Sequence, residues 1–113
     1  MITITQRNIG TVLIVAIAGS IAKTEDNAIR KMRQFFNSVR YLKVLLNLSG
    51  MTNFSLEAQG ELVFASRAAK EDGGKIELLS PSEAVVRRLT EGRLLQYFPV
   101  HDNEEEGIKA LNV

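Results

Sequence analysis

Three hydroxyl side chains that could carry chemistry lie in one segment, Lys43 to Leu62, where an apolar run passes through a polar turn into a helical pattern. They belong to Ser49, Thr52 and Ser55. The first turn of a helix presents unpaired backbone N–H groups and the positive end of the helix dipole. A phosphate placed there is stabilised, and it carries about 1.5 to 2 negative charges. A phosphorylated hydroxyl at this turn could therefore recruit or repel a partner.

The same residues also have a structural interpretation. Ser55 precedes the predicted helix and, as its N-cap, would stabilise that helix by about 1 kcal/mol. Ser49 and Thr52 can hydrogen-bond the backbone of the turn. Glu57 puts one fixed negative charge near the helix start. That charge either imitates a permanent phosphate or simply stabilises the first turn by about 0.3–1 kcal/mol. For each residue we favour the structural interpretation.

Other kinds of functional site lack the residues that they need. The sequence has no cysteine and one histidine, His101, which excludes disulfides, thiolate sites and histidine-rich metal sites. There is no Ser-His-Asp set and no glycine-rich phosphate loop, since Gly73 and Gly74 end a predicted helix. A net charge of +1 without a Lys/Arg stripe gives no case for nucleic acid. We expect no enzyme, no metal and no cofactor; a carboxylate pair formed only in three dimensions stays open as an alternative.

Hydrophobic periodicity predicts the elements that position this segment. The run from Thr11 to Ala18 is almost wholly apolar, as a strand covered on both faces should be. A strand–helix–strand crossover favours parallel pairing with a right-handed connection. We therefore predict an α/β fold, a small mixed sheet of about four to five strands with about four helices, in one domain spanning residues 1–113. The predicted strands are Ile2–Thr5, Thr11–Ala18, Tyr41–Leu48, Lys75–Leu79 and Tyr97–His101, and the predicted helices are 25–40, Ser55 or Leu56 to Glu71, 81–91 and one after Asp102.

Local signals mark the ends of these elements. Thr24 can cap the first helix. Ser80 can cap the third helix, with Pro81 in its first position and Glu83 reaching back as a capping box. Pro99 indicates that the last strand lies at an edge of the sheet, because proline cannot donate to a neighbouring strand.

The sequence shows no signal for a location outside the cytoplasm. Its beginning lacks the basic region, apolar run and cleavage site of a signal peptide. The longest apolar stretch, Val12 to Ala18, is far shorter than the about 20 residues that a bilayer crossing needs. We expect a bacterial-type cytoplasmic protein that does not insert into a membrane.

Three local patterns, in the right order and spacing, carry a resemblance to a known family. Gly19 to Ala22 follows the second strand, Leu46 to Leu48 ends the third and leads to Ser55 to Gly60, and Gly73-Gly74 and Ser80-Pro81 flank the fourth. These patterns are similar to those of STAS domains, the family of bacterial anti-sigma-factor antagonists. That family has Gly-x-aliphatic-Asp after the second strand, and Leu-Asp-Leu at the end of the third strand followed by Asp-Ser-Ser-Gly-Leu-Gly. It has Gly-Gly before the fourth strand and a Ser-Pro-like helix start after it. The chain resembles a STAS domain over roughly its whole length, which implies the same element order.

The chain departs from that family at the positions tied to phosphorylation. In many family members the first Ser of Asp-Ser-Ser is the phosphorylated residue, and the ungapped register puts Leu56 there. Leucine has no hydroxyl and cannot accept a phosphate. Asn47 and Ala22 replace two acidic residues of the family pattern. A register shifted by one residue, with Ser55 as substitute acceptor, is the alternative.

The resemblance implies a non-catalytic protein-interaction module in partner-switching regulation of transcription. Its expected partner is an anti-sigma factor that is also a serine kinase. STAS-like domains also occur as accessory subunits of membrane transport or signalling complexes, which is the alternative function. A homodimer formed through the first strand is a third possibility, because edge strands invite pairing. The expected partner-binding residues are Ser20, Ile21, Thr52, Asn53, Ser55, Leu56, Glu57 and Gln59.

Overall fold

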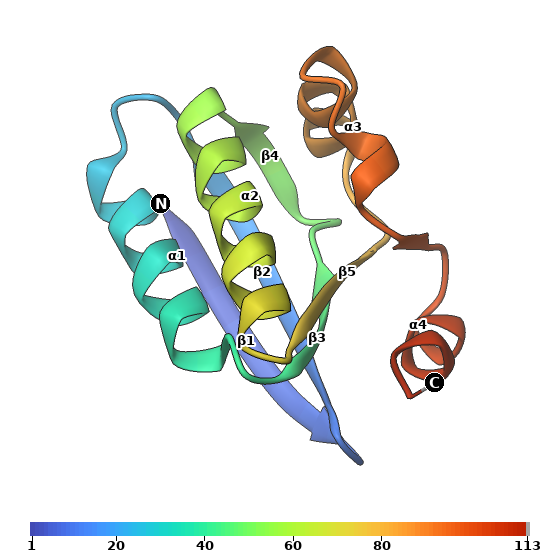
Figure 1. Cartoon of the computed structure of the whole chain (residues 1–113). Coiled ribbons are helices and arrows are strands. Elements are labelled where there is room, and N and C mark those ends of the chain that lie inside the picture. Colours follow the sequence, from blue (N-terminus) through green and yellow to red (C-terminus); the bar gives the residue numbers. More distant parts are fainter. Residues whose placement is uncertain (113) are drawn as a thin grey trace.

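The structure, a computed structural model, describes residues 1–112 and is built around a mixed six-stranded sheet (Figure 1). Its strands are β1 (Ile2–Ile9), β2 (Val12–Ile21), β3 (Lys43–Asn47), β4 (Met51–Phe54), β5 (Lys75–Leu79) and β6 (Val100–His101). Its helices are α1 (Asp26–Val39), α2 (Leu56–Glu71), α3 (Glu83–Glu91) and α4 (Glu104–Leu111), with a 3-10 turn η1 (Leu95–Tyr97). The sheet order is β1-β2-β3-β5-β6; β1 is antiparallel to β2, and the other pairs are parallel. β4 lies beside the end of β2, beyond the stretch that pairs with β3.

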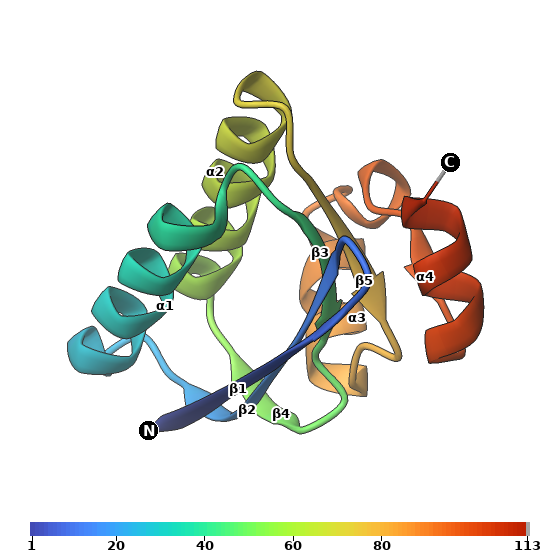
Figure 2. The same ribbon diagram turned by 90° about the horizontal axis from the view of Figure 1, so that it is seen from below.

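Helices cover both faces of the sheet (Figure 2). α1 and α2 pack side by side on one face, α3 extends the same core, and α4 covers the other face. The alternation of side chains along β2 explains both layers. Leu13 and Val15 enter the core beneath α1 and α2, whereas Val12 and Ile14 enter the smaller core that α4 covers. The predicted α/β fold with four helices is confirmed, and the described sheet has one strand more than predicted.

The helix α2 is positioned by a narrow buried face of small residues. Ala58, Leu62, Ala65 and Ala69 are its buried residues. Small side chains let a helix axis lie close to the sheet, so α2 packs on the sheet through this narrow face. The helix begins at Leu56 and ends at Glu71, as the sequence predicted.

The strand β4 was missed in the sequence, which predicted an irregular turn there. Its four residues show no alternation, because Met51 and Phe54 are buried while Thr52 and Asn53 between them are exposed. β4 pairs in parallel with the last residues of β2, past a register shift between Gly19 and Ser20. Ser20 and Ile21, which the sequence placed in a loop, are therefore residues of β2.

Two predicted helix caps and one predicted strand are corrected by the structure. α3 is capped by Ser82, whose Oγ accepts a hydrogen bond from the Val85 N–H at 3.4 Å. Ser80 instead adopts a positive φ of 46° and donates its hydroxyl hydrogen bond to the carbonyl of Asp102. Thr24 precedes the N-cap position of α1, which is Glu25. Tyr97, the first residue of the predicted last strand, is instead the last residue of η1. The strand β6 is only Val100–His101, and it lies at the sheet edge that the preceding proline indicated.

Two further features of residues 1–112 concern membrane-spanning helices and metal sites. Along residues 1–112, no helix combines the length and hydrophobicity that a bilayer crossing requires. The same residues contain no group of three or more His, Asp or Glu side chains placed to share a metal ion.

Candidate functional site

The start of α2 is an exposed corner between the ends of β2 and β4 and the helix α3 (Figure 1). Leu56 is the first residue of α2, and 60% of its surface is exposed. Glu57 follows in the first turn and is also exposed. More than half of the Leu56 surface is therefore available for contact with another molecule.

Ser55 is the N-cap of α2 and is only 7% exposed. Its Oγ accepts a hydrogen bond from the Ala58 N–H at 3.2 Å. Its backbone N–H donates to the carbonyl of Ile21 at 3.0 Å, which ties the start of α2 to the end of β2. Ser55 therefore acts as the N-cap of α2, which is the structural interpretation.

Replacing Ser55 by alanine should lower the free energy of unfolding by about 1 kcal/mol, because the Ala58 N–H loses its acceptor in a buried place. Urea unfolding followed by circular dichroism measures this loss. Ser49→Ala is the matched control, since Ser49 is exposed and precedes β4. Equal stability of the two variants would show that the cap does not support α2.

The two central residues of β4 face a shallow cavity shared with α3. Thr52 and Asn53 line this cavity of about 170 Å³ together with Ala84, Arg87 and Arg88. The partner-binding residues expected from the sequence include none from α3, so the contribution of this helix to the corner was not predicted. The paired arginines were the signal that could have indicated it.

The side chain of Arg88 connects α3 to the end of β4. Arg88 Nε donates a hydrogen bond to the carbonyl of Phe54 at 3.1 Å, and the arginine is half-buried. Arg87 forms a helical ion pair with Glu83. Because both arginines already have partners, the corner is not a strongly cationic surface.

Gln59 links α2 to the end of α3 instead of standing free at the surface. It is half-buried, and a Cβ added to Gly92 would lie 2.9 Å from its Nε2. Its Oε1 is buried and, within residues 1–112, has no hydrogen-bond partner. The side chain therefore fills the space between the start of α2 and the end of α3 and is not freely exposed at the surface.

The eight predicted partner-binding residues divide between surface and interior. Ile21 is fully buried, so its side chain is not available to a partner. Ser20 is half-buried and donates its hydroxyl to Glu25 Oε1 at 2.9 Å. The residues whose side chains reach the surface of this corner are Thr52, Asn53, Leu56 and Glu57.

Glu25 closes the connection between β2 and α1 beside this corner. Its carboxylate accepts hydrogen bonds from the Ala22 N–H at 3.0 Å and from the Ser20 hydroxyl, and it contacts the amino group of Met1. The Met1 amino group, the Ala22 N–H and the Ser20 hydroxyl, in that order of effect, lower the pKa of Glu25 from its ordinary 4.5 to about 2. All three donors favour the charged carboxylate.

The lowered pKa predicts an acid dependence that Glu25→Gln should remove. A carboxyl whose pKa is lowered by folding stabilises the protein fully above its ordinary pKa of 4.5 and loses that contribution as pH falls towards about 2. The melting temperature of the unchanged protein should therefore fall more steeply over this range than that of Glu25→Gln. Thermal unfolding at a series of pH values tests this, and parallel curves would contradict it.

The sequence of nearly the whole chain matches the model of a known protein family. The STAS domain family model matches residues 3–107, which is nearly all of the chain. The chain belongs to the STAS domain family. The resemblance inferred from the sequence motifs is thereby confirmed. No curated protein matches this STAS domain.

Solved structures share the fold of this STAS domain. A candidate anti-sigma factor antagonist from Thermotoga maritima superposes with a TM-score of 0.80 and 22% identity, covering 97% of this chain and 95% of the other. The anti-sigma factor antagonist SpoIIAA in its unphosphorylated form gives 0.79 and 15%, covering 97% and 96%. The phosphorylated form of SpoIIAA, a Bacillus cell fate determinant, gives 0.73 and 14%, covering 96% and 99%. At these identities the likeness establishes a common fold.

Proposed function

We propose that this STAS domain is a non-catalytic, cytoplasmic protein-interaction module that works like an anti-sigma-factor antagonist and binds its partner at the start of α2. The observation that carries the proposal is the exposed Leu56 at the first position of that helix. The family membership and the likeness to anti-sigma-factor antagonists support it. The proposed partner is an anti-sigma factor of the serine-kinase type, and nucleic acid is not among the expected partners.

The proposed docking surface has an apolar centre and a polar rim. Leu56 forms the centre, and Thr52, Asn53 and Glu57 surround it. Protein interfaces commonly have this anatomy, with an apolar anchor inside a polar border. Covering the exposed 60% of Leu56 is worth about 1–2 kcal/mol, enough to make this residue the main contributor to binding.

Gly60 supports the same location. It lies on α2 one turn after Leu56 and is exposed, and among the described residues no atom lies within 4 Å of where its Cβ would stand. A glycine inside a helix costs about 1 kcal/mol relative to alanine, and here the fold gives no reason for that cost. A partner that must approach the helix backbone closely would supply the reason.

Binding at this surface is proposed to lack the phosphorylation switch. In the ungapped register of the sequence motifs, Leu56 falls at the position of the family's phosphoacceptor serine, and it has no hydroxyl. The neighbouring Ser55 is buried, with its Oγ engaged by the Ala58 N–H. Phosphorylation of Ser55 would need the first turn of α2 to open, so constant docking is favoured over switching.

Mixing the purified protein with kinase-type anti-sigma factors of the same cell tests this function. We expect binding measured by calorimetry to be equal with and without ATP, because Leu56 has no hydroxyl and the hydroxyl of Ser55 is buried. Binding that disappears on incubation with ATP would overturn the missing switch. Absence of binding to every such factor, with co-purification in a membrane complex instead, would favour the accessory-subunit function.

A further inference from the structure

The outer edge of β5 is only partly covered by its neighbour. β5 pairs with β3 along all five of its residues. On the other side, β6 pairs only with Leu78 and Leu79. Within residues 1–112, the first part of β5, Lys75 to Glu77, therefore has no strand on its outer side.

The hydrogen-bond pattern shows which backbone groups this open edge presents. Lys75 N–H donates towards β3, to the carbonyl of Leu42, while Leu78 N–H donates outwards to the carbonyl of Pro99. Residues of a parallel strand alternate between the two sides, so Ile76 directs its N–H and C=O outwards. Pro99 has no N–H and cannot donate to Ile76, which is why the pairing with β6 stops there.

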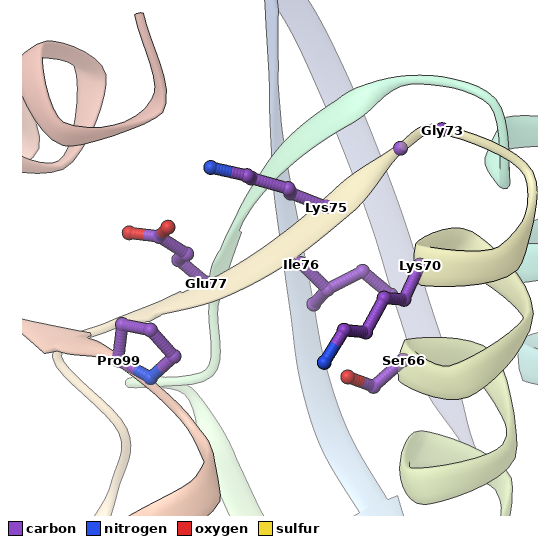
Figure 3. A pocket seen from close by; sticks show the side chains of 8 residues that line it. Ser66, Lys70, Gly73, Lys75, Ile76, Glu77 and Pro99 are labelled. Carbon is purple, nitrogen blue, oxygen red and sulfur yellow. The ribbon is translucent and has the colours of Figure 1, made fainter. Parts of the chain in front are cut away.

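A cavity of about 480 Å³ runs along this edge (Figure 3). Figure 3 shows Ser66 and Lys70 of α2 on the same side of β5 as Ile76, while Lys75 and Glu77 leave the strand on the opposite side. The open edge thus lies between two sets of side chains. An extended chain placed here would have polar groups from both faces of β5 around it.

A second cavity of about 410 Å³ continues the first, because Ser66 and Lys70 line both. Its wall is mainly apolar and includes Val63 of α2 together with Leu94 and Phe98. Tyr97 also lines it and is 69% exposed. The two cavities form one groove between α2 and the segment from Leu94 to Pro99, which we call the β5 groove.

The charges around the β5 groove are mainly positive. Arg67, Lys70 and Lys75 are exposed, and in the described part of the chain none of them has a carboxylate partner. The one carboxylate that lines the groove, that of Glu77, lies 2.6 Å from His101 Nε2. The groove therefore attracts acidic groups.

We propose that the β5 groove binds an extended acidic segment of another protein by strand addition. The segment pairs with the N–H and C=O of Ile76, its carboxylates lie near Arg67, Lys70 and Lys75, and one apolar side chain enters the second cavity. Main-chain pairing with side-chain selection in adjacent cavities is the usual form of strand addition. This site is separate from the start of α2 and does not depend on the function proposed there.

The probe for this site is a short fluorescent peptide in which glutamate alternates with valine around one central phenylalanine. We expect it to bind in anisotropy measurements and to shift the amide resonances of Lys75 to Leu79. Lys70→Glu should weaken binding about tenfold, because it replaces an attraction by a repulsion. Lys23→Glu, an exposed cation in the connection before α1, should have no effect. N-methylation of the peptide backbone should also weaken binding about tenfold, since it removes the pairing groups.

Three results would overturn the proposal. The first is that the peptide does not bind at millimolar concentration. The second is that the N-methylated peptide binds as tightly as the unmodified one. The third is that inorganic polyphosphate binds as tightly as the peptide, which would mean an anion site only. Circular dichroism confirms that Lys70→Glu is folded. Leu56→Asp should leave peptide binding unchanged, so failure here and failure of the function proposed for the start of α2 are observed separately.

Discussion

Replacing Leu56 by aspartate should weaken binding of the protein partner at least tenfold. The side chain is 60% exposed in the free protein and becomes covered in the proposed complex. Because only the exposed part of the side chain is newly covered, the lost apolar burial is about 1–2 kcal/mol, a factor of about five to thirty in affinity. Aspartate also brings a charge that would have to lose its water. Its position at the start of a helix is favourable for an acidic residue, so the fold should be preserved.

Tyr41→Asp is the control for this substitution. Tyr41 is 63% exposed, and it follows α1 at the end of the molecule away from the start of α2. It should leave partner binding within a factor of two. Calorimetric titration of both variants with the same partner measures the difference. Equal affinities of Leu56→Asp and the unchanged protein for the partner would contradict a docking surface at the start of α2.

Replacing Gly74 by alanine should destabilise the protein by about 3 kcal/mol. An added Cβ at Gly74 would stand 2.6 Å from the carbonyl oxygen of Leu42 and still closer to that of Arg40. Both are backbone atoms between α1 and β3, so they cannot rotate away as a side chain would. Gly74 N–H also donates to the Ala69 carbonyl at 2.7 Å, which fixes the turn from α2 to β5.

Gly60→Ala should have the opposite sign and provides the matched control. Alanine fits the open space at this helical position and should stabilise the protein by about 0.5–1 kcal/mol. Urea unfolding of both variants gives the two free energies directly. A stable Gly74→Ala variant would show that the backbone approach at that turn is looser than described. Gly60→Ala should also weaken partner binding, because the proposed partner approaches the helix backbone there.

Much of the fold could be predicted because long, regular segments carry their own signals. β2 is recognised by its continuous apolar run, and α2 by a small-residue face that repeats with the helical period. The boundaries of α2 were predicted well because Ser55 caps its start and Gly73 and Gly74 follow its end. Motif order and spacing then supplied the family, which the match over residues 3–107 confirmed.

The parts that could not be predicted depend on contacts between distant segments. β4 exists because the end of β2 offers it a partner beyond a register shift, and its four residues show no pattern of their own. His101 ends the last predicted strand, and the sequence did not indicate that it is half-buried beside the carboxylate of Glu77. Ile21 was predicted to bind a partner, but it is covered once β4 pairs beside it. None of these neighbours is close in sequence.

Mapping of phosphorylation sites on protein isolated from its native cell, with its partner bound, tests the missing switch most directly. Constant docking without a hydroxyl acceptor predicts that Ser49, Thr52 and Ser55 carry no phosphate while the partner is bound through Leu56. A phosphate found on Ser55 or Thr52, with the partner released from that fraction of the protein, would contradict it.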